Sequence, residues 1–122
     1  MQVITTDIHP SAHPDIAQWH TDRSFRPRPD RYTLLQGHVL PTRGGDTLFA
    51  DMVGAHKTLP PRWKDALEGA VGTHTHALRG DTARHPVVSR VPGPTRTALY
   101  LSRLYLTGIH YPGGSVTGPS VD

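Results

Sequence analysis

The chain has 122 residues, of which 35% are hydrophobic, with 12 glycines, 12 prolines and a formal net charge of +3. This length suggests a single domain, and the glycine and proline content favours short strands and turns over a helix bundle. The absence of cysteine excludes disulfides and thiolate metal sites, and no apolar run approaches the roughly 20 residues of a membrane span or follows a basic leader, so a cytoplasmic protein is expected.

Short strands are predicted in the N-terminal half. Val3–Thr6 is the first candidate, and a loop rich in proline and histidine follows it. Residues 31–40 are rich in β-forming residues and predict a longer strand. After a turn at residues 41–45, residues 46–50 predict another short strand.

Helical character is predicted in one place. Asp51 is a suitable N-cap for a helix over 52–59. Pro61 suits the first turn of a second helix, which Gly69 can close.

The C-terminal half returns to strands. Residues 70–78 alternate in character and predict a strand, and residues 79–84 predict a polar loop. Two further strands are predicted over 85–91 and 97–105, with a hairpin turn at residues 92–94. The chain is therefore expected to be mainly β and antiparallel with a short helical insertion, as in part of a jelly roll or barrel.

Nine histidines are unusual in a chain of this length. Most are expected to be ordinary residues in loops, on solvated faces or in a polar core: His9, His13, His38, His56, His74, His76 and His110. His20 differs because Asp22 follows it by two residues, and residues at that spacing in an extended segment point to one side. An imidazole with a carboxylate suits Fe(II), although the same three residues could form a surface loop with a local hydrogen bond.

The surrounding motifs are more specific. The segment W-H-T-D-x-S-F spans residues 19–25, and P-x-x-G-G-D-T-L-F-A-D-M spans residues 41–52. A pair of strand-like segments follows at residues 84–88 and 98–101. These motifs, in this order, resemble the taurine-dioxygenase-like (TauD/TfdA) family closely, and the resemblance covers about residues 3–109.

The resemblance implies a partial double-stranded β-helix, or jelly roll, in which His20 and Asp22 bind Fe(II). It implies that the hydroxyl of Thr47 helps to hold the co-substrate 2-oxoglutarate through a charge-assisted hydrogen bond, although Thr47 could also be an ordinary strand residue. The implied enzyme is a non-haem iron dioxygenase. It uses O2 and decarboxylates 2-oxoglutarate to succinate while it hydroxylates a small anionic substrate of the sulfonate, sulfate ester or aryloxyalkanoate class.

The chain departs from the family pattern after residue 109. The family's second metal-binding histidine and its 2-oxoglutarate-binding arginine have no counterpart here. Residues 1–109 are therefore expected to form a partial dioxygenase domain and residues 110–122 an unstructured tail. The chain is expected to be a truncated fragment, inactive or barely active alone, and His85 or His110 is a less favoured substitute for the third ligand.

Residues beside the metal motif have simpler expected roles. Trp19 and Phe25 are expected to pack under the site, and Arg23 either orients Asp22 or faces solvent. The alternative function is a non-catalytic remnant, or a binding protein that a partner chain completes. A nucleic-acid binder is disfavoured because the basic residues do not cluster among aromatic ones.

Overall fold

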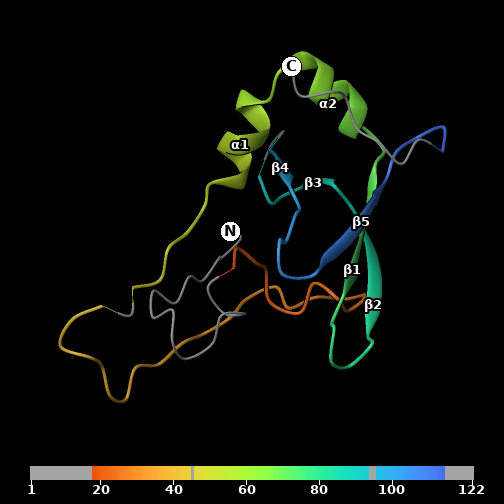
Figure 1. Cartoon of the computed structure of the whole chain (residues 1–122). Coiled ribbons are helices and arrows are strands. Elements are labelled where there is room, and N and C mark those ends of the chain that lie inside the picture. Colours follow the sequence, from red (N-terminus) through yellow and green to blue (C-terminus); the bar gives the residue numbers. More distant parts are fainter. Residues whose placement is uncertain (1–17, 45, 94–95, 115–122) are drawn as a thin grey trace.

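A computed structural model describes residues 18–44, 46–93 and 96–114 (Figure 1). The strand expected at Val3–Thr6 lies outside the described residues. Two helices are followed along the chain by five strands. The elements are α1 (Met52–Thr58), α2 (Pro61–Leu67), β1 (Val71–Thr75), β2 (Thr82–Pro86), β3 (Val88–Arg90), β4 (Thr97–Leu99) and β5 (Leu106–His110).

The strands form two antiparallel sheets. The larger has the order β2-β1-β5, and in it Val71 is paired with Pro86 on one side and with His110 on the other. The smaller is the β3-β4 hairpin, as the turn at residues 92–94 predicts. Strand β5 extends to His110, one residue past the expected end of the folded region, and residues 115–122 of the expected tail lie outside the described residues.

Both predicted helices are present. The Asp51 carboxylate accepts hydrogen bonds from the backbone N–H groups of Val53 and Gly54, each at 3.0 Å, and so caps α1. Those bonds, with the Gly54 amide first, lower the pKa of Asp51. Pro61 begins α2, and Gly69, two residues after its end, has a φ of 73°, a conformation that glycine adopts without strain.

The core lies where the helices meet the hairpin. Its buried members are Leu67, Ala70, Val87 and Leu99, and apolar residues of both helices pack against them. The backbone of Val87 joins the two sheets, because its N–H donates to the Ala70 carbonyl and its carbonyl accepts from the Tyr100 N–H. Burial of these apolar side chains is the main force that holds the helices on the strands.

The strands predicted at residues 31–40 and 46–50 are wrong. Neither segment has regular secondary structure, and in Figure 1 the orange-to-yellow trace of residues 26–44 runs away from the strands as a long loop. The side chains of Leu34 and Val39 are almost fully exposed. A β-forming sequence makes a strand only when another strand supplies its hydrogen bonds, and no described strand is paired with these residues.

Strand boundaries in the C-terminal half also differ from the expected ones. Residues 82–84, expected in a loop, belong to β2, and the strand expected over 97–105 ends at Leu99. The antiparallel, mainly β character with two short helices is confirmed. Among the described residues, no helix is long and apolar enough to cross a membrane.

Candidate metal centre

His20 lies in a loop, residues 18–26, that we call the metal loop. The His20 side chain is largely buried, and its Nδ1 lies 2.7 Å from the carbonyl oxygen of Gln18. A carbonyl can only accept, so Nδ1 carries the proton and donates it. In the neutral ring this leaves the Nε2 lone pair available, which is the arrangement that metal-binding histidines use.

The Nε2 atom of His20 faces the Asp22 carboxylate. Nε2 lies 3.4 Å from Asp22 Oδ1, and the other carboxylate oxygen, Oδ2, accepts a hydrogen bond of 2.7 Å from the Thr33 hydroxyl. Two neighbouring ligands of one cation, each at about 2 Å from it, lie about 3 Å apart. The donor atoms of this pair therefore fit a shared metal ion.

Aromatic rings border the pair. The Tyr105 ring meets the His20 ring edge-on, with centroids 6.1 Å apart, and also contacts Phe25. Burial, followed by the negative charge of Asp22, raises the pKa of Tyr105, so this side chain is a neutral phenol at physiological pH. Phe25 is buried, whereas Trp19 is 39% exposed.

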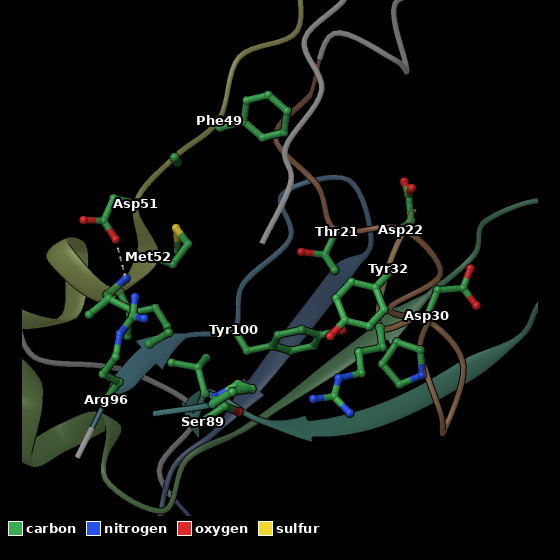
Figure 2. A pocket seen from close by; sticks show the side chains of 18 of the residues that line it. Thr21, Asp22, Asp30, Tyr32, Phe49, Asp51, Met52, Ser89, Arg96 and Tyr100 are labelled. Carbon is green, nitrogen blue, oxygen red and sulfur yellow. Dashed lines mark hydrogen bonds between the residues drawn. The ribbon is translucent and has the colours of Figure 1, made fainter. Parts of the chain in front are cut away.

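A pocket of about 950 Å³ lies beside the pair, with Asp22 in its wall. Figure 2 shows Asp22 and Tyr32 on one side, Asp51 and Arg96 on the other, and Tyr100 between them. The pocket wall contains both acidic and basic side chains together with aromatic rings. It can receive a small polar organic molecule next to the carboxylate.

Thr47 does not line the pocket beside the metal pair. It is half-buried in the irregular segment that leads to α1, and the pocket wall includes Phe49 and Ala50 but not Thr47. Its contact with 2-oxoglutarate stays a prediction. Arg23 forms an exposed ion pair with Asp30 at 3.2 Å and so does not orient Asp22 through a salt bridge.

A buried polar group lies beside the metal loop. His74 was expected in a loop, on a solvated face or in a polar core, and the structure places it in β1, where it is fully buried. Ser24, in the metal loop, is fully buried as well. The position of His74 in the alternating pattern of β1, where residues 72 and 74 are buried, was the only sequence signal for this burial. His85 and Tyr100 complete the group, with ring centroids 5.2 Å apart.

Neither His85 nor His110 approaches the metal pair as a third ligand. The His85 Nε2 atom lies 2.7 Å from the Ser24 carbonyl, and His110 Nε2 lies 3.2 Å from the Thr73 hydroxyl. Within residues 18–44, 46–93 and 96–114, no three histidine or acidic side chains come together as a metal-binding group. The described residues thus offer two candidate metal ligands, His20 and Asp22, that lie close together.

The structure is a mainly antiparallel β domain in which a histidine nitrogen faces a carboxylate oxygen at 3.4 Å, which makes the chain a candidate metalloprotein. Residues 2–117 match the family described as "Taurine catabolism dioxygenase TauD, TfdA family". The chain belongs to this family, whose enzymes use Fe(II) and 2-oxoglutarate.

Individual relatives agree with this assignment. The chain is 41% identical over 68 residues to an alpha-ketoglutarate-dependent 2,4-dichlorophenoxyacetate dioxygenase of Burkholderia sp., covering 52% of this chain and 23% of that protein. It is 43% identical over 115 residues to pentalenolactone F synthase of Streptomyces avermitilis, covering 70% and 38%. It is 29% identical over 101 residues to an alpha-ketoglutarate-dependent sulfonate dioxygenase of Saccharomyces cerevisiae, covering 71% and 24%. The chain therefore spans less than two fifths of the length of each relative.

Proposed function

We propose that this chain supplies the metal-binding pair of an Fe(II)/2-oxoglutarate-dependent dioxygenase. The observation that carries the proposal is the alignment of His20 Nε2 with Asp22 Oδ1 at 3.4 Å, with His20 Nδ1 held by the Gln18 carbonyl. In this reading the ring is fixed in the tautomer that leaves Nε2 free, and the carboxylate is oriented by Thr33. Both donors are thus in place before a metal arrives.

The proposed reaction hydroxylates a small anionic organic substrate of the sulfonate, sulfate ester or aryloxyalkanoate class. When bound, Fe(II) would supply the centre at which O2 is activated, while 2-oxoglutarate is oxidised to succinate and CO2 and the substrate gains a hydroxyl group. The protein's share is to hold and orient the reactants. We assign the Thr47 hydroxyl to the carboxylate of 2-oxoglutarate, and the pocket beside Asp22 to the organic substrate.

A metal titration tests the assignment of the pair. Co(II) serves as an air-stable substitute for Fe(II), and its binding to the 122-residue chain is followed by paramagnetic broadening of NMR signals. We expect broadening to centre on the metal loop, and we expect His20→Ala and Asp22→Ala each to weaken binding by at least tenfold. His38→Ala, which changes an exposed histidine in residues 31–40, is the control and should bind Co(II) as the unsubstituted chain does. Equal affinity of all four proteins for Co(II) would refute the proposal.

A turnover assay tests whether the chain works alone. With two protein ligands we expect weak retention of Fe(II) and little or no succinate from 2-oxoglutarate, because the family's site needs a second histidine and an arginine. Robust succinate production by the 122-residue chain would show that the described pair suffices. In any active assembly, Thr47→Val should raise the KM for 2-oxoglutarate without changing Co(II) affinity.

The alternative is a non-catalytic remnant or a binding protein that another polypeptide completes. The exposed apolar side chains of residues 32–40 favour completion, since Leu34 and Val39 are 89% and 92% exposed. Contiguous apolar side chains in water are typical of a surface that another chain segment covers. Succinate production that appears only when a polypeptide with the family's missing histidine and arginine is added would support this alternative.

A further inference from the structure

Two histidines from neighbouring strands converge on one serine of the metal loop. His74 in β1 places Nδ1 at 2.9 Å from the Ser24 hydroxyl, and His85 in β2 donates from Nε2 to the Ser24 carbonyl at 2.7 Å. Ser24 and His74 are both fully buried. Figure 1 shows β1 and β2 side by side, with the metal loop passing next to them. The three residues therefore tie the metal loop to the sheet through side chain and backbone together.

The residue between Asp22 and Ser24 is held in an unusual conformation. Arg23 has a φ of 54°, and among the described residues no other residue besides glycine has a positive φ. A side chain at Cβ makes this region unfavourable, so such a residue persists only where its neighbours over-determine the backbone. The ion pair of Arg23 with Asp30 is exposed and contributes little restraint. Two backbone hydrogen bonds close the turn, from the Ser24 N–H to the Thr21 carbonyl and from the Arg26 N–H to the Arg23 carbonyl. The contacts of His74 and His85 with Ser24 add a restraint from the sheet.

The His74 ring depends on Ser24 for its polar contact. Its Nε2 is buried and has no hydrogen-bond partner among the described residues. Burial, and then the proximity of His85, lowers the pKa of His74 to about 4, so the ring is neutral at physiological pH. Ring contacts with His85 and Tyr100, at centroid distances of 5.4 and 5.5 Å, fix its orientation. Loss of the serine hydroxyl would leave both ring nitrogens buried without a partner.

We propose that Ser24, clamped by His74 and His85, is a positioning residue that holds the Arg23 turn and thereby keeps the Asp22 carboxylate opposite His20. This inference rests on the proposed function of the His20–Asp22 pair. Ser24 touches no reacting group. It acts through two peptide units, since a change in φ at Arg23 would rotate the chain that carries Asp22.

The test compares two buried truncations in the 122-residue chain. Ser24→Ala removes the clamped hydroxyl, whereas Val87→Ala, in the core, lowers stability without touching the metal loop. For each variant, Co(II) affinity is measured by NMR broadening, and the Arg23 turn is monitored by the strong nuclear Overhauser effect between its own amide and Hα protons that a positive φ produces. We expect Ser24→Ala to raise the Kd for Co(II) about tenfold and to weaken that effect, and Val87→Ala to change neither.

The outcomes separate the positioning role from its alternatives. A Ser24→Ala chain with unchanged Kd and an unchanged Arg23 signal overturns the inference while leaving the metal site intact. Equal weakening by Val87→Ala also overturns it, because general loss of stability would then explain both results. Failure of the proposed function looks different: the unsubstituted chain and His20→Ala would bind Co(II) equally, and a positioning role toward a metal would fall with it.

Discussion

Strand β1 and residues 31–40 both contain β-forming residues, but they differ in what surrounds them. In β1 every residue is paired with β2, four of the five are also paired with β5, and every second residue is buried. Residues 31–40 have no strand beside them in the described structure, and Leu34 and Val39 face water. The difference shows that β-propensity becomes a strand only where tertiary structure supplies both a ladder and a covered face.

The largest expected contrast comes from shortening one leucine in the packed core and one leucine in residues 31–40. Leu67→Ala, at the buried C-terminal end of α2, should lower the free energy of unfolding by about 2–5 kcal/mol, because it removes buried methyl groups and leaves a cavity. Leu34→Ala should change it by no more than about 0.5 kcal/mol, since that side chain is already in water. Urea denaturation of the two variants measures both values. A large loss in Leu34→Ala would mean that residues 31–40 are packed in solution.

A pH titration gives the next largest contrast. The pKa of His74 falls from 6.5 to about 4 in the folded chain because burial disfavours the charged ring, so the unfolded chain binds more protons between those values. The contribution of His74 to the free energy of unfolding is therefore fully present above pH 6.5. It is lost as the pH falls toward 4, by up to about 3 kcal/mol.

Urea denaturation at several pH values checks this prediction. His74→Gln should flatten the stability profile between pH 6.5 and 4. The exposed His38 is the matched position, and His38→Gln should leave the profile as it is in the unsubstituted chain. An unchanged slope in His74→Gln would assign the pH dependence to other groups.

Two glycines give the smallest contrast. A Cβ at Gly72 would lie 2.9 Å from Leu106 Cδ1 and 3.2 Å from Nε2 of the buried His74, whereas a Cβ at Gly37 would lie 2.9 Å from Leu40 Cδ2. Leu40 is exposed and can turn away, but His74 cannot.

Gly72→Ala should therefore lower the unfolding free energy by about 1–3 kcal/mol through overpacking. Gly37→Ala should stay within about 0.5 kcal/mol of the unsubstituted chain. Thermal or urea denaturation distinguishes the two. Equal changes in unfolding free energy would mean that the side chains around Gly72 can shift to accommodate a methyl group as readily as those around Gly37.

Local features of the fold were predictable from sequence because they depend on residues a few positions apart. The cap by Asp51 and the start of α2 at Pro61 involve contacts within one helical turn. The alignment of His20 with Asp22 depends on a spacing of two residues, and the motif order pointed to the family that residues 2–117 match. Even the hairpin between β3 and β4 follows from a short turn signal.

Tertiary structure alone decided which β-forming segments became strands and which polar residues were buried. Ser24 meets His74 and His85 across 50 and 61 residues of chain, and a contact of that separation leaves no periodic trace in the sequence. Residues 31–40 remain irregular although their composition favours a strand. The physical reason is the same in both cases: hydrogen-bond partners and burial come from segments that are distant in sequence, and only the folded chain brings them together.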